Sequence, residues 1–356
     1  MCVKPFPTLR EDGAAVPGRV HSSPSARPGR TGATRFRSVV AAVALLAGFS
    51  GPAAGKTFRV ADNQVEDYPT VQALAFMDRL VQDRTGGRHR FQIFHSGQLG
   101  DEKNTVEQAR AGAIDLGRVN VTSLTALVPA TNALVLPFQF RSTEHLHAVL
   151  DGPVGTDILR AYEAAGLVGL TFYDSGARSL YNDVRPVRSP ADAAGLRIRV
   201  QPSDIMPDLM AALNVTPVQL AYSQVLAALQ TGLIDGAENN WPSYVTTGHH
   251  LHARHVTLTE HTTSPEVLLI SRRAWDGLSP DDQAIFREAA TASKFFMRER
   301  WRDWEEASRT RAAQSGSLVV TEFDRDAFLA AATAVRERYL ANPDTRALHD
   351  RIGAVR

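Results

Sequence analysis

One cation and two amides lie where two short hydrophobic segments end. Residues 195–200 (GLRIRV) alternate apolar side chains with arginines, and this period of two predicts a half-buried β-strand. Arg199 is the last charge on its face of that strand, and a later segment that begins at residue 233 ends on Asn239 and Asn240. Ligands of open α/β sheets bind at the carboxyl ends of the strands. A guanidinium fork beside two amides suits a carboxylate that also carries hydroxyl groups.

A helix, a glycine and a strand follow one another at two places in the chain. The helical pattern of residues 105–110 ends before Gly112, and a second helical pattern ends at Gly232. Each glycine opens a Gly-x-Ile-Asp segment, and glycine is the usual residue just beyond a helix. The first copy continues into a polar run that ends at Asn120. Four matching residues can arise by chance, but their shared context favours two similar lobes that face each other.

Other segments alternate between strand and helix patterns. Strands are predicted at residues 56–61, around Phe91, and at 167–173, 256–260 and 267–271. Helices are predicted at residues 70–83 and from Ser279, an N-cap followed by proline, to about residue 315. This alternation predicts α/β layers with mostly parallel sheets.

The length and the charge restrict the class of protein. A chain of 356 residues is long enough for about two domains with separate cores. Residues 1–55 hold seven of the 39 basic and two of the 38 acidic residues, which leaves 32 against 36 and a net charge of −4. A mildly acidic body argues against a nucleic-acid partner, because no excess of basic residues remains to neutralise phosphates.

The basic N-terminus is typical of an export signal. Arg35 and Arg37 precede residues 38–49, an apolar run of about a dozen residues, and small residues follow at 51–55. This order predicts a secretory signal peptide, whereas a membrane anchor needs about 20 apolar residues. Cys2, the only cysteine, lies within the predicted leader, residues 1–55. The exported protein is therefore expected to have no disulfide and no thiolate metal site.

Catalytic and metal-binding motifs are weakly represented. The sequence contains no phosphate-binding loop, nucleophile elbow or metalloprotease helix. Histidines cluster at His249, His250, His252 and His255, with His261 beyond them. A zinc site is one interpretation, but only Glu260 is near as a carboxylate, and a solvated helix end is the interpretation we adopt. We therefore expect no metal and no cofactor.

Residues 195–200 and 224–239 (QVLAALQTGLIDGAEN) resemble the solute-binding proteins of TRAP transporters, the DctP family of tripartite ATP-independent periplasmic transporters. Residues 96–102 (SGQLGDE) and 279–290 (SPDDQAIFREAA) add to a resemblance that covers nearly everything after residue 56. The chain departs from the family pattern with Gln224 in place of Glu and with Leu226 in place of Tyr. These departures affect local packing or ligand selectivity.

The resemblance implies a two-lobed α/β periplasmic binding protein fold with a hinge and a long helix that braces both lobes. Lobe I would comprise residues 56–175 plus about 265–304, and lobe II residues 176–264 plus about 305–356. The hinge is expected near residues 175–178 and 262–265. The implied role is that of a monomeric periplasmic receptor that works with the membrane subunits of a TRAP permease and is not an enzyme.

The resemblance also assigns roles to two arginines. Arg199 matches the arginine that pairs with the ligand carboxylate, and a structural salt bridge is the alternative. Arg178 matches a second arginine near the site in carboxylate-binding relatives, and a salt bridge at the hinge is the alternative.

Further candidate ligand contacts follow from the same resemblance. Asn239 matches the binding-site asparagine of the family motif, and Asn240 and Trp241 are candidates because they adjoin it. Asn120 and Glu102 match positions of acidic ligand contacts in sialic-acid-binding relatives, although a carboxylate at a helix start explains Glu102 equally well. Tyr222 stands where many relatives have an aromatic wall.

The ligand class follows from three further segments. Residues 173–182, 237–244 and 258–261 resemble the hexuronate-binding branch, whose members take D-glucuronate or D-galacturonate. Other sugar acids and small dicarboxylates remain alternatives. A periplasmic enzyme that acts on sugar acids is a further alternative, but no motif supplies its paired carboxylates or activated nucleophile.

Overall fold

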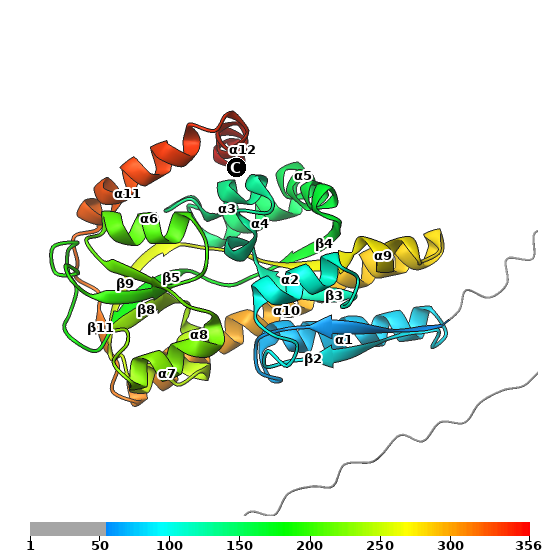
Figure 1. Cartoon of the computed structure of the whole chain (residues 1–356), viewed down its shortest axis with the longest axis horizontal. Helices are drawn as coiled ribbons and strands as arrows, with labels where there is room; N and C mark the ends of the chain where they lie inside the picture. Colours follow the sequence, from blue (N-terminus) through cyan, green and yellow to red (C-terminus); the bar gives the residue numbers. More distant parts are fainter. Residues whose placement is uncertain (1–54) are drawn as a thin grey trace, which may run out of the picture. The chain divides into compact units, whose positions relative to one another are not determined.

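Two β-sheets organise residues 55–356, which the computed structural model describes; the predicted leader, residues 1–55, lies outside them apart from Gly55. The strand order is β2-β1-β3-β10-β4 in sheet 1 and β11-β9-β5-β8-β6-β7 in sheet 2. Figure 1 labels β2, β3 and β4 of sheet 1 and β5, β8, β9 and β11 of sheet 2. Each sheet with its helices forms one lobe, named the first and the second lobe. The predicted two-lobed α/β fold is confirmed.

The first lobe takes its strands from two parts of the chain, residues 56–173 and residues 266–271. Its strands are β1 (Lys56–Ala61), β2 (His89–Phe94), β3 (Leu116–Asn120), β4 (Leu167–Tyr173) and β10 (Glu266–Ser271). Its helices are α1 (Pro69–Arg84), α2 (Glu102–Arg110), α3 (Asn132–Val135), α4 (Thr143–Asp151), α5 (Pro153–Ala161) and α9 (Arg272–Asp276). One apolar core lies where α1 and the long helix α10 (Pro280–Gln314) cover sheet 1, with Phe58, Leu74 and Phe286 at its centre.

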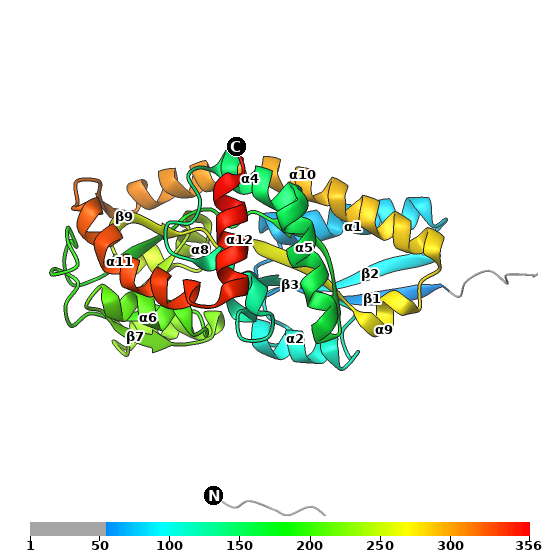
Figure 2. The same ribbon diagram turned by 90° about the horizontal axis from the view of Figure 1, so that it is seen from above.

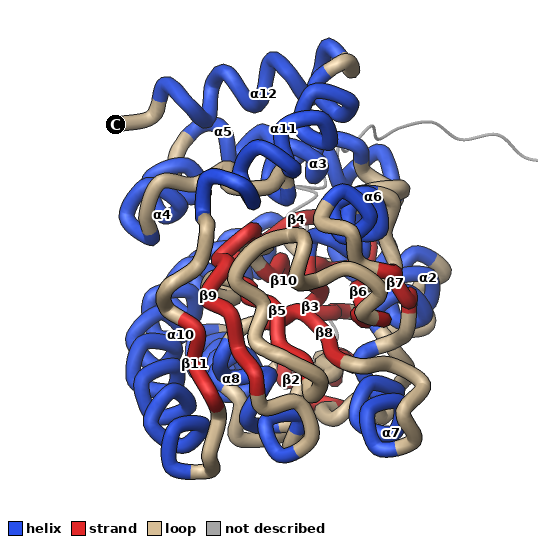
Figure 3. The backbone as a smooth tube through the Cα atoms, turned by 90° about the vertical axis from the view of Figure 1, so that its left-hand side faces the viewer, coloured by secondary structure: helices blue, strands red, loops and turns tan. Residues whose placement is uncertain are grey.

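The second lobe is built around the middle of the chain. Its strands are β5 (Arg178–Asn182), β6 (Arg197–Val200), β7 (Thr216–Gln219), β8 (Gly236–Asn239), β9 (His255–Thr262) and β11 (Leu318–Val320). Figure 3 shows α6 (Ile205–Ala212) and α11 (Arg325–Leu340) beyond one side of this sheet and α7 (Val225–Gln230) and α8 (Trp241–Thr246) beyond the other. Apolar side chains from the two sides fall into separate core clusters.

The sheets are mixed, and the prediction of mostly parallel sheets is therefore corrected. In sheet 1, β10 runs antiparallel to β3 and β4, whereas β1 is parallel to β2 and β3. In sheet 2, β5 runs antiparallel to β8 and β9, whereas the other pairings are parallel. The reversed strand of each sheet is the one that the chain enters directly from the other lobe. Its direction therefore follows from the crossing and not from a β-α-β turn.

The lobes are joined by two strand-to-strand connections, by the helix α10 and by the C-terminal segment. The chain crosses between β4 and β5 at residues 174–177, and again between β9 and β10 at residues 263–265. These connections coincide with the segments predicted as a hinge. The helix α10, capped by Ser279 and started by Pro280, contacts α1 and β4 of the first lobe and α8 of the second (Figure 2). It braces both lobes as predicted.

The C-terminal helices, which were predicted to belong to lobe II, contact both lobes. Helix α11 contacts α6 of the second lobe, whereas α12 (Pro343–Ala354) contacts α3 and α5 of the first. The C-terminal segment thus spans both lobes, although the predicted boundaries placed all of it in lobe II.

The two helix–glycine–strand units have the same local structure. Gly112 follows α2 with φ +75°, and Gly232 follows α7 with φ +68°. In the first unit, Asp115 Oδ2 accepts from the backbone N–H of Arg59 at 2.8 Å. In the second, Asp235 Oδ2 accepts from the backbone N–H of Arg197 at 2.8 Å. Each aspartate thus ties its loop to the neighbouring strand, so that β3 and β8 start in matching positions beside β1 and β6.

Substituting alanine for Gly232 is expected to destabilise the protein by about 1 kcal/mol, because an L-residue is strained at positive φ. No neighbouring atom lies within 4 Å of the added Cβ, so the loss would report backbone conformation alone. Gly353→Ala, in helix α12 and equally free of contacts, is the control and should be neutral or slightly stabilising. Chemical denaturation measures both, and unchanged stability of Gly232→Ala would contradict the assigned cap.

Candidate functional site

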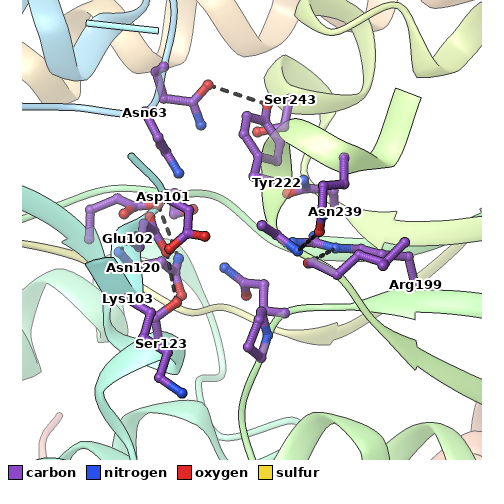
Figure 4. Close-up of a pocket in the computed structure, with 18 of the residues that line it drawn as sticks. Asn63, Asp101, Glu102, Lys103, Asn120, Ser123, Arg199, Tyr222, Asn239 and Ser243 are labelled. Atoms are coloured by element: carbon purple, nitrogen blue, oxygen red, sulfur yellow. Dashed lines mark hydrogen bonds between the residues drawn. The ribbon is translucent and has the colours of Figure 1, made fainter. Parts of the chain in front are cut away.

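A cavity of about 330 Å³ opens between the lobes at the ends of their inner strands (Figure 4). Asn120 and Asn239 are the last residues of β3 and β8, and Arg199 is the penultimate residue of β6. Arg178 is the first residue of β5, but because β5 is reversed, this start lies beside the end of β8. Seven of the eight predicted residues line the cavity: Glu102, Asn120, Arg178, Arg199, Tyr222, Asn239 and Asn240.

Arg199 is a buried cation that forms no ion pair with a carboxylate of residues 55–356. Its residue is 2% exposed, and its Nε donates to the backbone oxygen of Leu220 at 2.9 Å. Within residues 55–356, no hydrogen bond or ion pair engages its two terminal nitrogens. Burial lowers the pKa of Arg199, and the positive charge of Arg178 lowers it further, while Glu238 opposes both. An anion bound in the cavity would offset the unfavourable burial of the Arg199 charge.

Arg178 is held in a bidentate ion pair instead. Its Nε and Nη2 donate to the two carboxylate oxygens of Glu238 at 2.6 and 2.8 Å, and Nη1 donates to Asn239 Oδ1 at 2.8 Å. A further bond from Nη2 reaches the backbone oxygen of Glu238 at 2.7 Å. One N–H on Nη1 is left without a partner among the described residues. The salt-bridge alternative for Arg178 is therefore realised in the structure.

Glu238 was not among the predicted site residues. Burial alone would raise its pKa, but Arg178 and His261 outweigh burial and lower the pKa to about 2. The carboxylate lies 3.4 Å from His261 Nε2 and is fully buried. It therefore stays ionised and orients Arg178 and, through Arg178, Asn239.

The side-chain amide of Asn239 uses its oxygen but not its nitrogen in hydrogen bonds with the described residues. Its Oδ1 accepts from Arg178 and from the backbone N–H of Asn240, whereas its Nδ2 has no partner among residues 55–356. In Asn240 the donors are used by the hinge residue Ser175, at 2.7 Å to its backbone oxygen. The Oδ1 of Asn240 accepts from the backbone N–H of Ser243 and caps α8. Asn239 can therefore donate to a ligand, and Asn240 connects the hinge to α8.

Asn120 is similarly engaged by protein groups. Its Nδ2 donates to the backbone oxygen of Ser264 and to Glu266 Oε1, both at 3.0 Å, and its Oδ1 accepts from the backbone N–H of Thr122. Both donor hydrogens are thus used. The residue lines the cavity, but its geometry favours the orientation of Glu266 over a direct donor bond to a ligand.

A carboxylate cluster, named here the acidic wall, lies on the first-lobe side of the site and consists of Asp62, Glu102 and Glu266 around Arg118. Glu102, Glu266 and Arg118 line the cavity, and Asp62 pairs with Arg118. Arg118 Nη1 lies 3.1 Å from Glu102 and 2.7 Å from Glu266, and its Nε donates to Asp62 at 3.1 Å. Burial raises the pKa of Glu102, Arg118 lowers it and Glu266 raises it, with a net shift upward. The prediction contained only Glu102. Asp62 follows β1 and Glu266 starts β10, so polar residues at strand ends were the signal that could have revealed them.

Two hydrogen bonds cross between the lobes beside the cavity. Tyr222 Oη donates to Gln64 Oε1 at 3.3 Å, and Tyr68 Oη lies 3.2 Å from Ser243 Oγ. Tyr222 has its predicted place at the cavity wall, whereas Gln64 and Ser243 were not predicted. These pairs hold the two walls of the cleft together on the side of α1 and α8.

The prediction for Trp241 is corrected, because its side chain lies outside this cavity. Trp241 is the first residue of α8, where the chain turns away from β8. Its ring lies 6.0 Å from that of Tyr244 and 5.6 Å from the guanidinium of Arg309 on α10. It therefore fixes α8 against the long helix.

Of the four clustered histidines, His249 and His250 are buried, whereas His252 is exposed and His255 is half-buried, so the expected solvated helix end holds only for part of the cluster. His249, His250 and His261 are at most 3% exposed, and Tyr181 Oη lies 2.8 Å from His249 Nδ1. Burial lowers the pKa of His249 to about 3, and nearby Arg199 contributes to the decrease. In residues 55–356, no three His, Cys, Asp or Glu side chains are grouped to hold a metal ion.

None of the helices in the same part of the chain is long and apolar enough to cross a membrane.

The comparisons with known proteins agree with this architecture. The model of the family described as "Bacterial extracellular solute-binding protein, family 7", or DctP, matches residues 60–342. A TRAP periplasmic solute-binding protein from Bradyrhizobium sp. BTAi1, solved with α/β-D-galacturonate, is 45% identical, with a TM-score of 0.82 over 83% of this chain and 99% of that one. One from Xanthobacter autotrophicus Py2 with bound β-D-galacturonate is 42% identical, with a TM-score of 0.82 over 84% and 100%. One from Roseobacter denitrificans with bound β-D-glucuronate is 37% identical, with a TM-score of 0.82 over 85% and 100%.

The family match covers most of the chain, and the solved relatives are covered almost completely. The cleft between the two lobes lies at the carboxyl ends of strands, where ligands of α/β sheets bind, and it includes Arg199, which has no ion pair among residues 55–356. The chain therefore belongs to family 7 of the bacterial extracellular solute-binding proteins, the DctP family of TRAP transporter receptors.

Proposed function

We propose that this protein is the periplasmic receptor of a TRAP transporter for a hexuronate, D-galacturonate or D-glucuronate. The observation that carries the proposal is Arg199, a buried guanidinium whose terminal nitrogens have no partner in the described chain and line the cleft. A planar fork of this kind binds a carboxylate through two parallel hydrogen bonds. The relatives solved with these two sugar acids support the ligand class.

The remaining groups suit the hydroxyl-rich part of such a ligand. The free Nδ2 of Asn239 is a donor, and the carboxylates of Glu102 and Glu266 are acceptors for sugar hydroxyls. The cavity of about 330 Å³ lies in the range that binds small molecules. The ring of Tyr222 provides an apolar surface for the sugar face.

In this proposal the exported, monomeric protein captures the uronate and closes its lobes about residues 174–177 and 263–265. The closed receptor then delivers the uronate to the membrane subunits of the permease. The uronate leaves the cleft chemically unchanged.

A thermal-shift comparison tests the ligand class. D-Galacturonate or D-glucuronate at about 100 times its dissociation constant should stabilise the protein by about 2.7 kcal/mol, which raises Tm by roughly 4 °C for a folded chain of about 300 residues. D-Galactose and D-glucose, which lack the carboxylate, are the matched controls and should leave Tm unchanged. Small-angle scattering of the same samples checks the closure, and NMR checks that the sugar is unaltered. No shift with either uronate would refute the proposal.

A further inference from the structure

The two walls of the ligand cleft carry opposite charge. On the second-lobe wall, Glu238 neutralises Arg178, so that Arg199 leaves one positive charge. On the first-lobe wall, the acidic wall carries three carboxylates around the single cation Arg118. Resting on the proposed function, we propose that the acidic wall makes this receptor selective for acids with one carboxylate and rejects acids with a carboxylate at both ends.

Among the described residues, the charge of the acidic wall is balanced by Arg118 alone. Asp62, Glu102 and Glu266 each form their ion pair with Arg118 and with no other basic side chain of residues 55–356. Arg118 is 2% exposed, and Asp62 and Glu266 are buried as well. Three carboxylates around one guanidinium leave a formal charge of −2 in a region that solvent hardly screens.

Lys103 does not remove this excess. Its side chain lines the same cavity from the first turn of α2, but the residue is exposed and has no ion pair among the described residues. A solvated ammonium at the cavity mouth is screened by water, whereas the carboxylates of Glu102 and Glu266 share the buried Nη1 of Arg118.

The opposite charges of the two cleft walls discriminate between ligands of equal length. Once a carboxylate binds Arg199, the other end of the ligand faces Glu102 and Glu266. A hydroxyl there donates a hydrogen bond to a carboxylate, whereas a second carboxylate has no proton to donate and meets like charge. Like charges placed against a wrong ligand are a general device for specificity. A hexuronate or hexonate would therefore be accepted, and a hexarate, with carboxylates at both ends, would be excluded.

Glu102→Gln is the most conservative test of the acidic wall. Glu102 Oε1 accepts from Arg118 Nη1 and from the backbone N–H of Asn120, and the glutamine oxygen can keep both bonds. Glu102 Oε2 accepts from Ser123 Oγ at 2.7 Å, and after the substitution the hydroxyl can accept from the amide instead. The matched control is Glu107→Gln on the same helix, whose exposed side chain pairs with Arg110 outside the cavity.

Calorimetric titration with D-galacturonate, D-galactonate and galactarate measures the selectivity. Galactonate and galactarate are both open chains, so their comparison isolates the second carboxylate from ring shape. The wild type is expected to bind galactarate at least about a hundredfold more weakly than galactonate or galacturonate. Glu102→Gln should reduce this ratio by about tenfold, and Glu107→Gln should leave it unchanged.

The outcomes separate the inference from the proposed function. Wild-type protein that binds galactarate as tightly as galacturonate would overturn the inference while the receptor role stands. A folded Glu102→Gln variant with the wild-type ratio would overturn it as well. If that variant does not fold, the same measurements on Glu266→Gln replace it, and the ratio of galactonate to galactarate affinity in the wild type still tests the inference. Wild-type protein that binds none of the three acids would instead remove the proposed function, and the inference with it.

Discussion

Replacing Arg199 with alanine is expected to weaken uronate binding by roughly a hundredfold to several thousandfold. The bound carboxylate would then be desolvated in the cleft without its partner, and breaking a buried pair from one side costs about 3–5 kcal/mol. Each 1.4 kcal/mol corresponds to about a tenfold change in affinity. Because Arg199 has no ion pair in the described chain, its removal should leave no unpaired protein charge, and folding stability should change little. Calorimetric titration with both uronates measures the loss.

Two further variants control this experiment. Arg199→Lys should recover only part of the affinity, because a point charge does not reproduce the planar fork. Arg197→Ala, two residues earlier on β6, removes a partly exposed arginine that pairs with Asp235 outside the cavity, and binding should stay near the wild-type level. Wild-type affinity in folded Arg199→Ala would exclude Arg199 as the carboxylate clamp.

Arg178→Ala is expected to act mainly on stability, with a loss of about 3–5 kcal/mol in the free energy of unfolding at neutral pH. The substitution leaves Glu238 fully buried without its bidentate partner, and His261 Nε2 remains 3.4 Å away. In the wild type, Arg178 and His261 outweigh burial and lower the pKa of Glu238 from 4.5 to about 2. The ionised carboxylate therefore contributes about 3 kcal/mol above pH 4.5, and this contribution is lost as the pH falls from 4.5 towards 2.

The pH dependence distinguishes this ion pair from a packing effect. The difference in stability between wild type and Arg178→Ala should shrink below pH 4.5, because the wild type loses the contribution of Glu238 there. Replacing both partners by apolar side chains, as in Arg178→Met with Glu238→Leu, should restore most of the stability at neutral pH. Chemical denaturation at several pH values measures both effects. A stability difference that is independent of pH would contradict the assigned ion pair.

Local sequence patterns were sufficient for much of the fold and for part of the site. The alternation around Arg199 and the Gly-x-Ile-Asp segments at Gly112 and Gly232 placed strand ends correctly, because these signals are contained in neighbouring residues. Glu266 was missed because it reaches Arg118 across 148 positions, through the insertion of β10 beside β3. Such a pairing depends on sheet order, which a local pattern does not encode.

The hydrogen-bond partners of the site asparagines could not be predicted from the sequence either. Asn120, Asn239 and Asn240 are equivalent as residue types, yet only Asn239 keeps both donor hydrogens free of described partners. The difference arises from Ser175 and Ser264 in the two crossings, whose positions follow from tertiary structure. Trp241 was assigned by adjacency alone, and the turn into α8 directs its side chain elsewhere.

The reversed strands also determine how the chain can fold. Sheet 1 has β10 as an inner strand between β3 and β4, and sheet 2 has β5 between β9 and β8. Sheet 1 therefore cannot be completed until the chain has passed through the whole of β9, and pairing of β3 with β10 closes a loop of about 150 residues. Contacts of such long range slow folding, because loop closure is unfavourable before the contacts form. If the chain were cut at the two crossings, each sheet would expose the unpaired edge of a strand that is normally an inner strand. The two lobes, which form opposite walls of the cleft, must therefore fold together as one unit.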